Sequence, residues 1–301
     1  CGRKGGLYLS ACIKVKPFPL PKYPKSDQPH ADNPGGERYP FADEQVTTGI
    51  REATITGKPY PIKGWFVYAT NLIHAMPNQE ETIRAIRALD LLVVVDVIPS
   101  EIAGWADVVL PEATYLERYD DLNVETFREP FIALRQPVVT PPADQKPNWW
   151  IARELALKLG LGAYYPWHDI EEYLDFRLKG AGLSLAELKQ KGLVRGPQQP
   201  LYFEDGVPAE FPTPSGKIEF YSTQLKDAGF DPVPRYTRPA DGPPGSFRLL
   251  SGRAPVHTFS RTQSNPVLRD AMDENEVWIN GDVGARLGLH SGDYVRLRNQ
   301  D

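Results

Sequence analysis

The sequence predicts an α/β fold with an open, mostly parallel sheet and helices on both faces, followed by the start of a C-terminal β-barrel domain. Residues 91–95 are branched and apolar without alternation, which is typical of a strand covered on both faces. An apolar run at 64–71 and a helical pattern at 80–89 precede that strand. From Phe247 onward the sequence becomes β-rich. Together these features favour a layered α/β unit joined to a barrel.

The elements of the α/β unit follow in order along the chain. The strand at 64–71, the helix at 80–89 and the strand at 91–95 form a β-α-β unit. A third, short strand is expected at 108–110 and ends at Pro111. The connection before this strand is long enough for one or two helical turns.

Composition and the positions of the Pro- and Gly-rich stretches divide the chain into four regions. They are an irregular Pro- and Gly-rich tail of an upstream domain (1–60), the α/β unit (61–145), a helical and extended connection (146–245) and a truncated β-barrel (246–301).

Helices in the connection are expected from Asn148, which can serve as the N-cap, to Gly160 or Gly162, and then at 169–178 and 183–189, the last capped by Ser184. A hairpin or strand is expected around the Pro-Ser-Gly turn of residues 211–222. In the last region, strands are expected in FRLLSGR, NEVWIN and SGDYVRLRN, with a short helix in GDVGARLG. The chain ends before such a barrel closes, which predicts an unpaired edge.

Composition excludes several classes of function. The chain has 301 residues, a net charge of −5 and scattered basic residues, so we expect no nucleic-acid face. No apolar run approaches the roughly 20 residues of a membrane-spanning helix, so direct membrane insertion is not expected. Cys1 and Cys12 form no zinc or cluster motif, and no metal ligands are predicted in this chain.

Polar side chains follow each strand of the predicted sheet. They are Thr70 and Asn71; Asp96, Ser100 and Glu101; and Glu112 and Thr114. Ligands of open α/β sheets bind outside the carboxyl ends of the strands. These side chains are therefore expected to converge on one rim.

Several segments together resemble the molybdopterin oxidoreductases of the DMSO reductase family. They are FVYATN, VVVDVIPSEIAGWADVVLPEATYLER, PSGKIEFYS and LLSGRAPVHTFSRTQSNP. The resemblance runs from about residue 5 to residue 301 and is greatest to the catalytic subunits of polysulfide and thiosulfate reductases. It implies a bis(molybdopterin guanine dinucleotide) cofactor with molybdenum or tungsten, and two-electron reduction of a small sulfur compound.

The resemblance also implies features that this chain does not itself contain. The metal ligand is absent from this chain and a 4Fe-4S cluster is expected in the missing N-terminal part, so the chain is interpreted as an inactive fragment of a larger catalytic subunit. Expected partners are an iron-sulfur electron-transfer subunit and a membrane anchor subunit, which would hold the protein on the periplasmic side.

Asp96 is the candidate reader of guanine. A carboxylate accepts from both N–H groups of the guanine edge, whereas the alternative is an Asp that caps the next turn. Thr70 and Asn71 stand where relatives have a Thr-Asn-Pro segment, although Leu72 departs from that pattern. Their hydroxyl and amide groups can donate to phosphate or ribose. Ser100 is expected to contact ribose or phosphate, although Ile102 departs from the Thr-Glu-Thr segment of many relatives.

A second candidate set lies in the last region. Its members are Gly252, Arg253, His257, Ser260, Thr262 and Gln263. Gly permits close backbone approach and Arg offers a planar fork of donors; in relatives this loop lines the pterin near the metal. The alternative for His257 is a partly buried ring satisfied by backbone. Among the other histidines, His74 alone follows a strand end closely enough to be a further candidate.

The remaining acids have less specific interpretations. Asp107, at the start of the third strand, is expected to make a buried structural hydrogen bond or ion pair. Residues 117–120 follow the strand and are candidates to approach the guanosine from the other side. Glu112 and Glu117 could form an acid/base pair, although a solvated or paired surface is the commoner outcome.

Two alternatives of other classes remain open. One is a non-catalytic electron-transfer scaffold that resembles the large subunit of respiratory complex I, and the other is a plain nucleotide-binding module. The substrate also remains open among polysulfide, thiosulfate, tetrathionate and arsenate.

Overall fold

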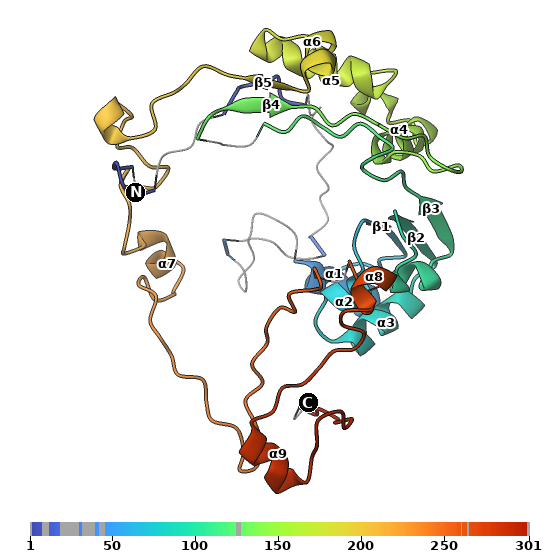
Figure 1. Cartoon of the computed structure of the whole chain (residues 1–301), viewed down its shortest axis with the longest axis vertical. Coiled ribbons are helices and arrows are strands. Elements are labelled where there is room, and N and C mark those ends of the chain that lie inside the picture. The colour runs from blue at the N-terminus through green and yellow to red at the C-terminus, as the bar shows by residue number, and fades with distance from the viewer. Residues whose placement is uncertain are drawn as a thin grey trace.

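The structure is a computed structural model of the whole chain. The residues that it describes are 2–7, 12–18, 30–31, 40–41, 46–124, 128–259, 261–263 and 265–299. Their elements follow an open arc, with the parallel sheet on one side and the chain after α6 returning along the other (Figure 1).

The sheet has three parallel strands in the order β1-β2-β3. They are β1 (Gly64–Tyr68), β2 (Leu91–Asp96) and β3 (Val108–Pro111). Tyr68 pairs with Val95, and Asp96 pairs with Pro111, so the three carboxyl ends lie side by side. The connections contain α2 (Leu72–Ala75), α3 (Gln79–Arg87) and the 3-10 helix η1 (Glu101–Trp105). The predicted β-α-β unit, third strand and one-turn connection are therefore confirmed.

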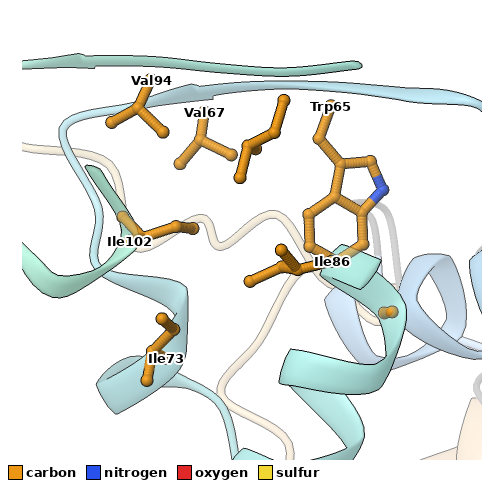
Figure 2. Close-up of a cluster of buried hydrophobic side chains, with 8 residues drawn as sticks. Trp65, Val67, Ile73, Ile86, Val94 and Ile102 are labelled. Carbon is orange, nitrogen blue, oxygen red and sulfur yellow. The ribbon is translucent and has the colours of Figure 1, made fainter. Parts of the chain in front are cut away.

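One face of the sheet carries the first hydrophobic core. The buried side chains are Trp65, Val67, Ile73, Ala85, Ile86, Leu92, Val94 and Ile102 (Figure 2). Successive side chains of a strand point to opposite faces, and in β1 only the second and fourth residues are buried. The helices α2 and α3 and the 3-10 helix η1 supply the other side of this core.

The opposite face of the sheet is only partly covered by other elements. Phe66 and Tyr68 of β1 are 49% and 41% exposed, and Leu91 at the start of β2 is 46% exposed. Val95, near the end of β2, is buried. The continuous apolar run of β2 predicted cover on both faces because the sequence contains nothing that distinguishes its two sides.

A helix lies within the region that was expected to be irregular. This helix, α1 (Thr47–Thr56), packs on the sheet unit through Ile50 and Ile55. Its Thr54 hydroxyl accepts a hydrogen bond from the Trp65 indole at 3.1 Å. Gly57 ends it in the left-handed region (φ 70°), which glycine adopts without steric cost. A short helix rich in Thr has weak intrinsic propensity, so tertiary packing stabilises it.

A second group of elements surrounds an antiparallel strand pair. Strands β4 (Phe131–Ala133) and β5 (Leu193–Arg195) are accompanied by α4 (Asn148–Lys158), η2 (Gly162–Tyr164), α5 (Ile170–Leu178), η3 (Lys179–Ala181) and α6 (Leu185–Lys191). Its core contains Leu122, Ile132, Leu174, Leu178, Leu185 and Leu188.

The three helices predicted in this region are confirmed, with one corrected cap. Asp169 caps α5 and Ser184 caps α6 through hydrogen bonds of 2.9 and 3.2 Å from backbone N–H groups. Asn148 does not cap α4, because Pro147 occupies that position and Asn148 is the first helical residue. Proline fits there because it lacks the N–H that a helix start leaves unsatisfied.

The last region does not show the expected barrel. Its described residues form α8 (Pro266–Arg269) and α9 (Gly281–Leu287), and extended chain joins them to η4 (Phe203–Asp205) and α7 (Thr223–Asp227) of the preceding region (Figure 1). The helix predicted in GDVGARLG is confirmed as α9, and the Pro-Ser-Gly turn forms with Gly216 at φ 68° but without flanking strands. The segments expected as strands lie exposed, as Trp278 at 90% illustrates. A strand needs a paired neighbour to be stable, and among the described residues these segments have none.

Candidate functional site

The rim formed by the ends of the three strands is the candidate site. Backbone hydrogen bonds of 3.0 Å join Ala69 to Val95 and Glu112 to Asp96, which extends the sheet one residue beyond its strands. The structure thus places the predicted strand-end residues along one edge, as expected for parallel strands. Ala69 has φ 51°, a left-handed conformation that is uncommon for alanine. Such conformations occur often at binding sites, where the surrounding structure maintains them.

Asp96 makes two local hydrogen bonds at the centre of this rim. Its Oδ1 accepts from the Val97 backbone at 2.8 Å, and its Oδ2 accepts from the Ser100 hydroxyl at 3.0 Å. These two bonds are those expected of an Asp that caps the next turn, which was the alternative interpretation of Asp96. A carboxylate has about four acceptor positions, so Asp96 retains acceptor capacity for a ligand.

Asn71 and Glu101 connect the ends of β1 and β2. The Asn71 side-chain amide donates to Glu101 Oε2, and His74 Nε2 lies 3.5 Å from Glu101 Oε1. Asn71 is buried, and its Oδ1 has no hydrogen-bond partner among the described residues. Thr70, the neighbouring candidate, is half-buried. His74, the further candidate among the histidines, thus lies at the same rim.

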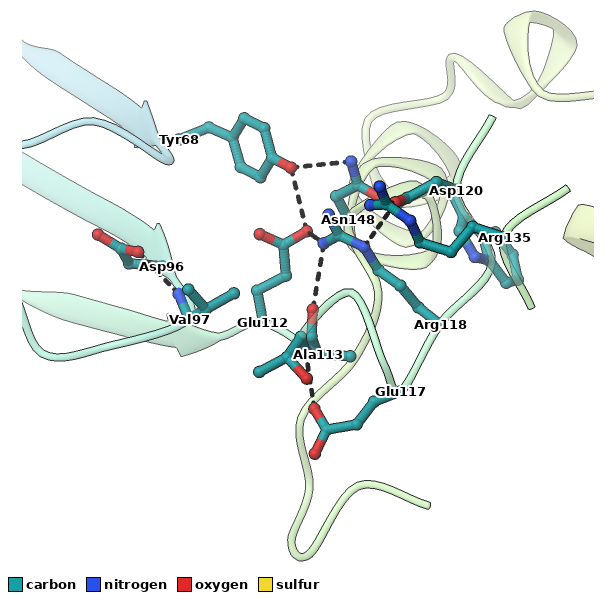
Figure 3. A network of polar contacts seen from close by, with 12 residues as sticks. Tyr68, Asp96, Val97, Glu112, Ala113, Glu117, Arg118, Asp120, Arg135 and Asn148 are labelled. Carbon is teal, nitrogen blue, oxygen red and sulfur yellow. Dashed lines mark hydrogen bonds and ion pairs between the residues drawn. The ribbon is translucent and has the colours of Figure 1, made fainter. Parts of the chain in front are cut away.

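A buried ion-pair network closes the rim on the β3 side (Figure 3). Glu112, only 3% exposed, pairs with the Arg118 guanidinium and accepts a hydrogen bond of 3.1 Å from the Tyr68 hydroxyl. Asn148 of α4 donates to the same hydroxyl at 2.9 Å. Arg118 also contacts Asp120 at 2.9 Å. The network therefore ties together the ends of β1 and β3, the loop after β3 and the start of α4.

Burial raises the pKa of Glu112 above its ordinary value of 4.5, while Arg118 and the Tyr68 hydroxyl oppose that rise. The native carboxyl then keeps its proton at pH values where the unfolded chain has lost it, so this group lowers stability as pH rises from 4.5. We expect the free energy of unfolding of the wild type to fall relative to that of Glu112→Gln as the pH increases above 4.5. Urea unfolding at several pH values measures this difference. A stability difference that instead grows in favour of the wild type would contradict the raised pKa.

The other acids of this segment have structural contacts. Glu117 Oε2 accepts from the Thr114 backbone at 2.7 Å and so closes a turn. Glu112 and Glu117 therefore have separate partners, and the acid/base pair considered from the sequence does not form. Asp107 Oδ2 accepts from the Leu92 backbone at 2.7 Å, which agrees with the structural role expected for it. Asp107 is exposed, so the expectation that it is buried was wrong.

The second candidate set forms a turn of its own. His257 contacts the Thr262 hydroxyl at 3.3 Å and the Met272 carbonyl at 2.8 Å, which matches the alternative of a partly buried, satisfied ring. The Arg253 guanidinium lies 4.2 Å from the centre of the Phe259 ring. Gly252 is exposed, and Gln263 donates to the Phe259 carbonyl at 2.5 Å.

Ser260 lies outside the described residues. The hydrogen bonds of His257, Thr262 and Gln263 stay within residues 257–272, whereas those of the rim residues stay within residues 68–148. The two candidate sets thus form separate networks in this structure.

A cavity of about 580 Å³ lies beside the rim, between the open face of the sheet and α4 and α5. Phe66 and Val95 line its sheet side, and Trp149 and Ala156 line its helix side. Phosphates require clustered N–H and cationic donors, and this largely apolar lining does not provide them. The rim therefore remains the better candidate for a dinucleotide.

Within the described residues no three His, Cys, Asp or Glu side chains gather as metal ligands. No helix among them is both long and apolar enough to cross a membrane.

Sequence reasoning missed the roles of Tyr68, Arg118 and Asn148. The one signal in the sequence was the position of Glu112, directly after the third strand. A residue at a strand end becomes buried when other segments cover that end, and a buried glutamate needs partners. The partners of that glutamate come from β1, the following loop and α4, and nothing in the local sequence joins these three segments.

Comparison with known proteins identifies the family. Residues 28–158 match the molybdopterin oxidoreductase family. The thiosulfate reductase molybdopterin-containing subunit PhsA of Salmonella typhimurium is 34% identical over 286 residues, which cover 87% of this chain and 38% of that protein. Acetylene hydratase of Syntrophotalea acetylenica is 32% identical, over 82% of this chain and 35% of that protein.

A solved structure supports the same assignment. Acetylene hydratase from Pelobacter acetylenicus superposes with a TM-score of 0.68 at 27% identity, covering 84% of this chain and 36% of that one. The chain thus spans a little over a third of the length of these relatives. Relatives named as reductases and the matched family together place this chain among proteins that carry molybdopterin. Residues 28–158 of this chain are a molybdopterin oxidoreductase domain.

Proposed function

We propose that the chain is part of the catalytic subunit of a molybdenum or tungsten oxidoreductase, and that its rim holds the guanine dinucleotide form of the pterin cofactor. The observation that carries this proposal is the buried, unpartnered Oδ1 of Asn71 at the carboxyl end of β1. An unpaired buried acceptor is costly. A ligand with N–H or O–H groups at this edge satisfies it.

The side chains of the rim fit such a ligand. Asp96 retains acceptor positions for the two N–H groups of a guanine edge, and the hydroxyls of Thr70 and Ser100 suit ribose or phosphate. Arg253, Gly252, His257, Ser260, Thr262 and Gln263 remain candidates for the pterin side. When bound, the cofactor supplies two-electron redox chemistry, and the residues of this chain orient it.

Thiosulfate is the first substrate to test for the whole protein, with polysulfide as the second, because PhsA is a thiosulfate reductase subunit. An iron-sulfur subunit, a membrane anchor subunit, a 4Fe-4S cluster and a periplasmic location are parts of the same proposal. The likeness to acetylene hydratase makes hydration of acetylene the contrasting activity to assay. Turnover of acetylene without reduction of any sulfur compound would overturn the substrate assignment.

Two aspartates of neighbouring strands provide a matched test of the cofactor site. We expect Asp96→Asn in the full-length protein to lose most bound pterin and molybdenum, because an amide cannot accept from both N–H groups of guanine. Asp107→Asn should keep the cofactor and stay within about 0.5 kcal/mol of the wild-type stability, because the amide oxygen can still accept from the Leu92 N–H and the side chain is exposed. The measurements are pterin fluorescence, metal analysis and urea unfolding.

The paired design separates binding from folding. Cofactor loss in Asp107→Asn but not in Asp96→Asn would reverse the two roles. Wild-type full-length protein without pterin, molybdenum or tungsten would overturn the enzyme proposal itself and favour a nucleotide-binding module or an electron-transfer scaffold.

A further inference from the structure

Asn71 immediately precedes α2, at the position where an asparagine normally caps a helix. The side-chain oxygen of a capping Asn usually accepts from the first N–H groups of the helix. Asn71 makes no such bond. Asn71 is only 5% exposed, and its Oδ1 is buried without a hydrogen-bond partner among the described residues. Something other than capping therefore determines how this amide is turned.

Glu101 provides the physical cause. The Asn71 Nδ2 donates to Glu101 Oε2, and an ionised carboxylate has acceptors but no donors. The two ends of an Asn amide are nearly equal in shape, so their placement follows from the partners. Because the nitrogen must face Glu101, the carbonyl oxygen must face away from it.

Glu101 is itself held between two elements. It is the first residue of η1, directly after the loop from β2, and its Oε1 lies 3.5 Å from His74 Nε2 at the end of α2. The carboxylate therefore spans the gap between the segment that follows β1 and the segment that follows β2. More than half of the Glu101 side chain is exposed, whereas Asn71 is buried.

We propose that Glu101 is a positioning residue that turns Asn71, so that the Asn71 carbonyl oxygen accepts a hydrogen bond from the bound dinucleotide. This inference rests on the proposed function and refines it. From the sequence, the Asn71 amide was expected to donate to phosphate or ribose. The structure assigns its carbonyl oxygen the opposite role, because one amide N–H is engaged by Glu101 and the buried oxygen has no partner among the described residues. A phosphate oxygen offers no donor, so the partner group is a base N–H or a ribose hydroxyl.

The test exchanges donor and acceptor between the two positions. In Glu101→Gln the new amide can donate to Asn71 Oδ1, which removes the free acceptor. We expect pterin to leave the full-length protein about tenfold faster, the effect of roughly one hydrogen bond. The double variant Asn71→Asp/Glu101→Gln places the donor at position 101 and the carboxylate at position 71, which leaves one oxygen free again. It should regain most of the lost retention.

The control is Glu81→Gln, which removes a surface carboxylate that pairs with Arg84 on α3. It should release pterin at the wild-type rate, and circular dichroism melting verifies that all variants are folded. If Glu101→Gln retains pterin as the wild type does, or if the double variant shows no recovery, the positioning role is wrong. A wild-type protein that contains no pterin contradicts the proposed function instead, so the two failures are distinguishable.

Discussion

Replacing Arg118 by alanine is expected to destabilise the chain by about 3–5 kcal/mol at pH 7, because it leaves a buried carboxylate without its counter-ion. Glu112 is 3% exposed, and its remaining partners, the Tyr68 hydroxyl at 3.1 Å and the Asn148 backbone N–H, are uncharged. The hydroxyl cannot neutralise a charge. The expected result is a large drop in the midpoint of urea unfolding.

Arg135→Ala is the matched control for this substitution. Arg135 contacts Asp120 in the same network, but its side chain is 56% exposed. Exposed ion pairs contribute about 0–1 kcal/mol. Equal losses for Arg118→Ala and Arg135→Ala would mean that water reaches Glu112, and the network would then not be a buried brace of the rim.

The second large effect is expected at Ile102 in η1. This side chain is fully buried in the core beneath the sheet (Figure 2). Ile102→Ala should cost about 2–5 kcal/mol, because it removes buried methyl groups and leaves a cavity. Since Glu101 and Ile102 are neighbours in η1, this loss should also loosen the hold of Glu101 on Asn71.

Ile218→Ala is the corresponding control, because Ile218 is 49% exposed in a segment without regular structure. Exposed substitutions usually change stability by less than about 0.5 kcal/mol. Chemical denaturation of both variants measures the difference directly. A small effect at Ile102 would show that η1 does not depend on its packing under the sheet.

The local sequence was sufficient for the elements with strong periodic or capping patterns. The run at β2, the amphipathic α3 and the cap Ser184 were all predicted and found. Each depends on side-chain alternation or on a hydrogen bond to a backbone group a few residues away. Such interactions need no distant partner.

The errors have the opposite origin. Helix α1 was missed because its stability comes from packing on the sheet unit. The barrel strands were expected from alternating apolar residues near Phe247 and Trp278, yet these segments lie exposed and unpaired in the described chain. Apolar alternation indicates that a segment can pair, but pairing itself requires a second segment at the right register.

The sequence by itself determined the family, the parallel sheet and the edge at which polar residues gather. Strand ends are recognisable because apolar runs stop at polar residues, and parallel strands bring those ends together. Only the tertiary structure decided what each residue does there. It paired Glu112 with Arg118, gave Asp96 local partners, and turned the Asn71 oxygen away from Glu101. These roles depend on burial and on partners from separate segments, and both arise only when the chain folds.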